Sequence, residues 1–189
     1  MARNGILCLE GDWETGLIRR RSLVPVLHLV RSQWNLPFIH RTASTRDEFR
    51  NVINEWKKAK YSSYPILYLG FHGQPGALQI GRDSVPIVDL VELADTGRNR
   101  MVHFGACETL NAKDSYLRHF LKMTDFVAIC GFKDEVDWLH SAALEILILD
   151  ELSRRKISPA NISIFEKNLK VMAGTLVKHL EFRVWKRSR

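Results

Sequence analysis

The chain has 189 residues, of which 46% are hydrophobic and 26% charged, and its formal net charge is +7. This balance excludes disordered, collagen-like and low-complexity proteins, and the length suits one domain, 1–189, with a basic C-terminal tail at 183–189. No run of about 18 apolar residues is present to span a membrane. The apolar run that ends at Glu10 lacks a signal peptide's length and cleavage pattern, so we expect a cytoplasmic protein.

The chain alternates between strand-like and helix-like segments. Short apolar runs predict strands at 5–10, 37–42, 65–71, 101–104 and 126–130, followed by a final edge strand at 181–185. Apolar residues at helical spacing predict helices at 22–30, 45–56, 87–94, 117–121, 141–152 and 165–180. Ser22 is the expected cap of the first helix, and Thr45 with Glu48 forms a capping box for the second.

The helix expected at 141–152 is apolar nearly all round. Such a helix is buried on several sides, either in the core or against another subunit.

This alternation predicts an α/β fold with a mostly parallel sheet covered on both faces. Functional sites in such sheets gather beyond the carboxyl ends of the strands. The glycine-bearing turns expected along this rim are 11–14, 70–73, 105–108 and 131–134.

Two residues on these turns suit nucleophilic chemistry. The three cysteines include no C-x-x-C pair, so neither disulfides nor a zinc site is expected. Cys8 and Cys130 lie in apolar runs and are predicted to be small buried hydrophobes, whereas Cys107 follows a strand after two small residues. If the strands are neighbours, His72 reaches the same rim and can activate the thiol. Gly73 and Cys107 are then the natural N–H donors to an oxyanion; the alternative is that Cys107 and His72 never meet.

Other candidates are weaker. His103 would stand about 13 Å from Cys107 along one extended run, beyond the reach of a base, and is expected to be a satisfied core histidine. The remaining helical histidines are expected to be exposed or helix-capping: His28, His119, His140 and His179. The glycines of 70–76 lack nucleotide-binding spacing and a Walker lysine, and no G-x-S-x-G elbow is present.

The turns Phe71-His72-Gly73 and Gly105-Ala106-Cys107, each following a strand, resemble those of the caspase-like cysteine peptidases. That group includes caspases, metacaspases, legumains, separases and bacterial CHAT domains. The resemblance covers about 5–152 and implies a three-layer α/β/α sandwich. It also implies an endopeptidase in which Cys107 is the nucleophile, His72 is the general base and acid, and the Gly73 and Cys107 N–H groups form the oxyanion hole. This chemistry needs no metal or organic cofactor, and no calcium loop is present.

The resemblance further implies a specificity pocket. The turn at 131–138 looks like the acidic turn of metacaspases, in which Asp134 or Glu135 would pair with a basic residue before the scissile bond. The same turn can instead be a solvated helix cap. Asp12 and Glu14 are weaker candidates for the same role.

The chain departs from caspases in ways that bear on substrate and regulation. Gly105 stands where caspases carry glutamine, so cleavage after aspartate is not expected. No activation linker or sensor domain is evident, which suggests a separate regulatory or activating protein as a partner. By analogy of fold alone, small bacterial relatives serve in stress or antiphage defence.

Two non-enzymatic hypotheses remain. The apolar segment 141–152 motivates a catalytically silent interaction module that forms a homo-oligomer. Basic runs lie at 19–21, 154–156 and 183–189. They either bind the phosphates of a nucleic acid or form solvated helix ends and a frayed tail. We favour solvated ends, so a nucleic-acid partner is not expected, because no nucleic-acid-binding motif accompanies the charge.

Overall fold

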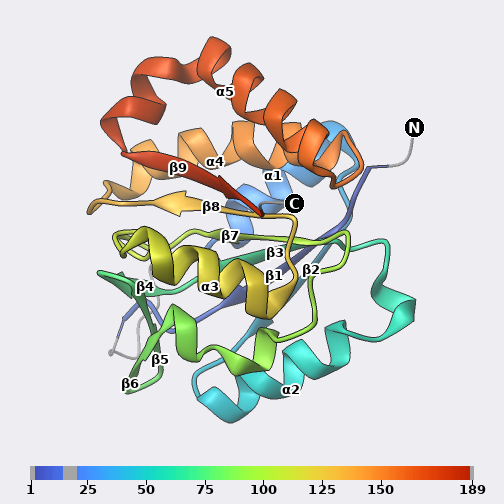
Figure 1. Ribbon diagram of the computed structural model, residues 1–189. Helices are drawn as coiled ribbons and strands as arrows, with labels where there is room; N and C mark the ends of the chain where they lie inside the picture. The colour runs from blue at the N-terminus through green and yellow to red at the C-terminus, as the bar shows by residue number, and fades with distance from the viewer. Residues whose placement is uncertain (1–2, 15–20, 188–189) are drawn as a thin grey trace.

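Six strands form the central sheet in the computed structural model, which describes residues 3–14 and 21–187 (Figure 1). The strands are β1 (Ile6–Glu10), β2 (Phe38–Thr42), β3 (Ile66–Gly70), β7 (Met101–Phe104), β8 (Ala128–Phe132) and β9 (Phe182–Lys186). Their order is β2-β1-β3-β7-β8-β9, and every neighbouring pair is parallel except β8 and β9. The predicted mostly parallel sheet is confirmed.

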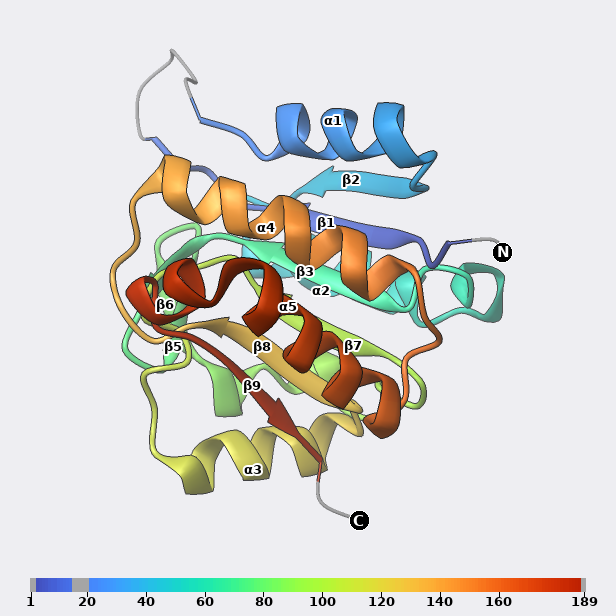
Figure 2. The ribbon, with the colours of Figure 1, turned by 90° about the horizontal axis from the view of Figure 1, so that it is seen from above.

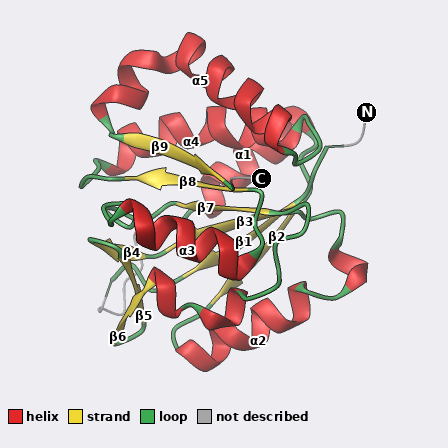
Figure 3. Cartoon of the chain, viewed as in Figure 1, coloured by secondary structure: helices red, strands yellow, loops and turns green. Residues whose placement is uncertain are grey.

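Helices cover both faces of this sheet. One face carries α1 (Val24–Trp34), α4 (Trp138–Ser153) and α5 (Pro159–His179), as Figure 2 shows from above. The other face carries α2 (Arg46–Trp56) and α3 (Asp114–Thr124), together with the short turns η1 (Ala59–Tyr61), η2 (Ile87–Asp89) and η3 (Val91–Leu93) (Figure 3). The architecture is therefore α/β. None of the helices in the described residues is long and apolar enough to cross a membrane.

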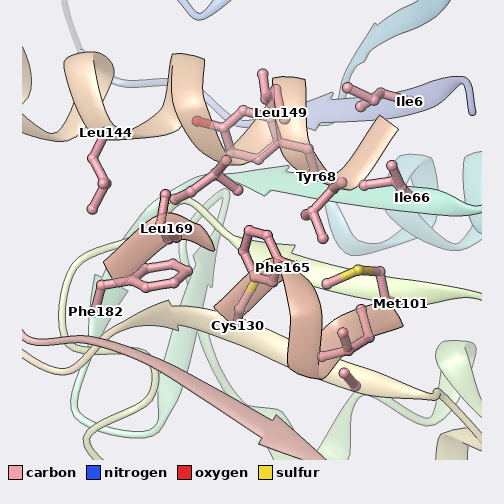
Figure 4. Close-up of a cluster of buried hydrophobic side chains, with 14 of the residues drawn as sticks. Ile6, Ile66, Tyr68, Met101, Cys130, Leu144, Leu149, Phe165, Leu169 and Phe182 are labelled. Carbon is pink, nitrogen blue, oxygen red and sulfur yellow. The ribbon is translucent and has the colours of Figure 1, made fainter. Parts of the chain in front are cut away.

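The strands divide their side chains between two cores. In β1, Ile6 and Cys8 join the core under α1, α4 and α5, whereas Leu7 and Leu9 join the core over α2 and α3. This division follows from the period of two in a strand. Figure 4 shows part of the first core. Continuous burial along β1, β3 and β8 explains why these strands read as unbroken apolar runs.

The nearly all-apolar helix α4 is buried by its own chain. It packs against α1 on one side and α5 on the other, and Leu144, Ile148 and Leu149 are fully enclosed. The predicted burial on several sides is confirmed and needs no second subunit. Leu139, at the start of α4, is a large hydrophobic residue that is nevertheless 73% exposed.

The prediction of a helix at 87–94 is wrong. The segment forms the two 3₁₀ turns η2 and η3, which are separated at Leu90 by non-helical dihedral angles (φ −77°, ψ 58°). Ile87, Leu90 and Leu93 are buried, whereas Val91 is 59% exposed. The buried hydrophobic residues recur at every third position, which is the period of a 3₁₀ helix and not that of an α-helix.

A second, smaller sheet was not predicted. It consists of β4 (His72–Gln74), β5 (Ala77–Ile80) and β6 (Asp83–Pro86), which pair antiparallel and follow directly after β3. Gly76 adopts a φ of 72° in the tight turn between β4 and β5, a conformation that favours glycine.

Several described residues of the basic runs are engaged within the fold. Arg154 and Arg155 end α4 and pair with Asp150 and Glu151 one turn earlier. Most of the segment expected as a basic tail is the edge strand β9. Arg19, Arg20 and the last two residues lie outside the described residues.

Candidate active site

The turns after β3 and β7 meet because these two strands are parallel neighbours in register, with Leu69 opposite Phe104. Gly73 lies directly against the backbone of Cys107: a Cβ atom at position 73 would stand 1.8 Å from the Cys107 carbonyl oxygen. Only glycine permits this approach. The structure therefore brings the two turns that carry His72 and Cys107 together.

The ring of His72 is oriented by a backbone carbonyl. Its Nε2 lies 2.8 Å from the Trp13 carbonyl oxygen, and the two rings contact edge to face at 5.3 Å. A carbonyl oxygen only accepts hydrogen bonds, so Nε2 carries the proton. In the neutral ring the lone pair is then on Nδ1, which makes Nδ1 the basic atom.

The Cys107 thiol is half-buried and points toward a different carbonyl. Its Sγ lies 4.0 Å from the Val136 oxygen, and no hydrogen bond joins Cys107 to His72 among the described residues. Burial raises the pKa of the thiol, and the Glu135 and Glu108 carboxylates add to the increase. The resting thiol is therefore protonated at neutral pH, and it could act as a nucleophile only if a base removed its proton.

Two N–H groups beside the thiol are available to an oxyanion. The Cys107 N–H donates to no carbonyl oxygen in the described part of the chain. Gln74 and Ala77 close a two-residue turn and so form a hydrogen-bonded pair. The alternation of an antiparallel ladder then turns the Gly73 N–H away from β5.

Sequence reasoning missed Glu10, a buried carboxylate that organises the first turn of the rim. One oxygen accepts from the Trp13 indole N–H at 2.6 Å and from the Leu23 N–H at 2.7 Å. The other accepts from Ser22 at 3.0 Å and lies 2.7 Å from His40 Nε2. These hydrogen bonds lower the pKa of Glu10 against the opposing effect of its burial.

Glu10 thereby fixes Trp13, whose carbonyl holds His72. It also anchors the start of α1, because it accepts from the N–H of Leu23, the residue before that helix. The prediction that Ser22 caps this helix is wrong: Leu23 occupies the cap position, and Ser22 accepts only from the Val24 N–H. A charged residue at the end of an otherwise apolar strand is a sequence signal that could have identified Glu10. The role of the Trp13 carbonyl has no such signal, because every residue carries one.

Two cavities meet at Trp13. One, of about 820 Å³, is lined by His72, the loop 12–14, the start of α2 and the β5–β6 turn. The other, of about 440 Å³, is lined by the same loop together with Glu10, Trp138 and Leu139. Cys107 is not among the described lining residues of either cavity, whereas His72 lines the larger one. The open space therefore lies beside His72 and not beside Cys107.

The acidic residues expected to select a substrate lie in two places. Asp12 and Glu14 line both cavities. Asp134 and Glu135 are exposed on a turn that contacts the cysteine loop, where the Asp134 carbonyl accepts from Glu108 and its carboxylate accepts from the Glu135 N–H. Asp137 is the cap of α4, since it accepts from the N–H groups of Leu139 and His140.

The other cysteines and histidines lie where the sequence predicted. Cys8, Cys130 and His103 are fully buried. Cys130 Sγ lies 3.4 Å from His103 Nδ1, and His103 Nε2 lies 3.6 Å from Glu145 Oε1 without forming a hydrogen bond among the described residues, so this histidine is only partly satisfied. The four helical histidines are exposed: His28, His119, His140 and His179. No group of three or more candidate ligands for a metal ion is found among the described residues.

The fold and this site define an α/β protein with a histidine and a half-buried cysteine on adjacent strand-end turns. The sequence matches DUF6642, a family of unknown function, over residues 3–186, and the chain belongs to that family. No curated protein matches it.

Proposed function

We propose that this protein is a caspase-like cysteine endopeptidase in which Cys107 is the nucleophile and His72 is the base. The observation that carries the proposal is the meeting of two strand-end turns, with the His72 ring held so that Nδ1 is its basic atom. The sheet order and the helices on both faces are compatible with a three-layer sandwich of that type.

In the proposed reaction one thiol forms the covalent bond to the substrate, and one imidazole carries out every proton transfer. His72 Nδ1 takes the Cys107 proton as sulfur attacks the scissile carbonyl, and the Gly73 and Cys107 N–H groups stabilise the oxyanion. The imidazolium gives this proton to the leaving amine as the C–N bond breaks, leaving a thioester. Water, deprotonated by His72, then hydrolyses the thioester, releases the carboxylic acid half and restores the thiol.

We propose a basic residue before the scissile bond. Asp12 and Glu14 place carboxylates beside the cavity that His72 lines, and Asp134 and Glu135 add negative charge beside the cysteine loop. Carboxylates recognise arginine and lysine through charge-assisted hydrogen bonds. The substrate in this proposal is a protein, and a separate activating protein would increase the fraction of molecules in which His72 Nδ1 contacts the Cys107 thiol.

Labelling with an acyloxymethyl ketone probe that carries arginine tests the proposal. We expect labelling of the native protein and of Cys130→Ala, because Cys130 is fully buried, and loss of labelling in Cys107→Ala. His72→Ala should reduce the labelling rate by about 10²-fold or more, the usual contribution of a positioned base. Equal labelling of Cys107→Ala and Cys130→Ala would contradict the assignment.

Two observations favour a second candidate, a catalytically silent interaction module. The thiol has a raised pKa and no direct bond to His72, which are also the features of an inactive pair. In that case Cys107→Ala and His72→Ala leave the cellular phenotype intact, and the native protein does not cleave arginine- or lysine-containing peptides.

A further inference from the structure

A basic cavity lies at the opposite end of the strands from Cys107. It has a volume of about 480 Å³ and is bordered by Asn4, Pro65 and Arg100, which precede the sheet strands β1, β3 and β7. Since Arg100 comes before β7 and Cys107 follows it, the cavity is separate from the candidate active site.

Four basic side chains from three distant segments line this cavity. Lys57 follows α2, Arg98 and Arg100 precede β7, and Lys156 lies between α4 and α5. Among the described lining residues, Asp95 is the one that is acidic. No ion pair joins any of the four cations to a carboxylate within the described residues, in contrast to the neighbouring Arg154 and Arg155.

The burial of Arg100 without a counter-ion among the described residues is the strongest indication that the cavity binds an anion. Its side chain is only 9% exposed, and its guanidinium lies 4.4 Å above the Trp56 ring. Burial alone lowers the pKa of Arg100, and no carboxylate opposes that effect. A buried charge without a counter-ion is costly, so buried arginines are normally paired. Arg100 lines the cavity, where a bound anion would supply the missing charge.

We propose that this cavity binds a small, multiply charged phosphate compound such as a di- or triphosphate. Arginine recognises phosphate oxygens through paired N–H groups, and lysine adds a compact charge. Several cations around a concave surface also concentrate an anion there. The volume is that of a small-molecule site.

Calorimetric titration of the full chain with sodium triphosphate, at about 50 mM salt to limit screening, tests the proposal. We expect saturable binding that weakens at least about tenfold in the double variant R98Q/K156Q, which removes two exposed charges from the cavity. The matched control is R118Q/K122Q, which removes two exposed charges from α3. Melting curves of both variants confirm that they fold, and R100K tests the buried guanidinium separately.

The outcomes are distinct. Equal affinity in R98Q/K156Q and its control, or no binding of triphosphate by the native protein, overturns the proposal. Binding of a short single-stranded oligonucleotide without binding of triphosphate also overturns it, in favour of a nucleic-acid surface. Labelling of Cys107 serves as a second readout, and it is expected to be unchanged in R98Q/K156Q. A failed titration therefore leaves the peptidase proposal intact.

Discussion

At the residue scale, the environment of Cys107 opposes ionisation. The thiol is partly removed from water, and the carboxylates of Glu135 and Glu108 lie close enough to disfavour a thiolate. Cysteines that react as preformed thiolates sit instead in positive surroundings. In the proposed reaction the thiol therefore depends on His72 taking the proton during attack.

Replacing Glu135 with glutamine should make the thiol more acidic. Removing a negative charge beside Cys107 lowers the cost of forming the thiolate, so its pKa falls toward the ordinary value. We expect iodoacetamide to alkylate Glu135→Gln faster than the native protein at pH 7, and the rate to reach half its maximum at a lower pH. Asp114→Asn, on the exposed surface of α3, is the control. An unchanged alkylation profile in Glu135→Gln would show that the carboxylate does not act on the thiol.

At the element scale, the small hairpin sheet determines where His72 stands. The turn after β3 does not run on into a loop but enters β4, whose middle residue Gly73 packs against the Cys107 carbonyl. Any side chain at position 73 would push the hairpin away from the cysteine loop. The spacing of the two turns therefore depends on one missing Cβ atom.

Gly73→Ala should damage the site and the fold together. The new Cβ would overlap a backbone carbonyl, and relief of that overlap should cost about 1–3 kcal/mol of the free energy of unfolding. We expect a lower urea midpoint and slower labelling of Cys107. Gly174→Ala is the matched control, because nothing lies within 4 Å of a Cβ there, and alanine is a better helix former by up to about 1 kcal/mol. Native-like unfolding and labelling of Gly73→Ala would contradict the close approach.

At the scale of the whole molecule, Glu10 joins parts of the fold that are distant in sequence. Its carboxylate links the end of β1 to Trp13, to the start of α1 and to His40 on β2. A carboxylate that accepts several hydrogen bonds is stabilised in its charged form, which is why its pKa is lowered despite burial. The stability of this corner of the molecule therefore depends on pH.

The pH dependence has a definite sign. Because the pKa of Glu10 is lower in the folded state, its contribution is complete above the unfolded value of 4.5 and is lost as the pH falls through the folded value. Glu10→Gln should be less stable at pH 7, by about 1–3 kcal/mol, since its amide cannot accept from all four donors. The difference from the native protein should shrink below pH 4, as measured by urea unfolding at each pH. Parallel pH curves for the two proteins would contradict this assignment.

The fold class and the two turns of the candidate site could be predicted because their signals are local. Apolar runs that end in glycine indicate buried parallel strands, and residues that follow such strands share one rim. The same reasoning identified Cys107 and His72 while assigning Cys8 and Cys130 to the core. It did not predict the small sheet after β3, whose strands are only three or four residues long.

Other features were decided only when distant segments packed together. The contact of Trp13 with His72, the hydrogen bonds around Glu10 and the gathering of Lys57, Arg100 and Lys156 all join residues far apart in the chain. Such contacts depend on distances across the folded molecule. The sequence around a backbone carbonyl or a lysine does not indicate which distant residue will lie beside it. Local chemistry determined which residues stand at the strand ends, and tertiary packing determined how they are oriented and which charges remain without partners.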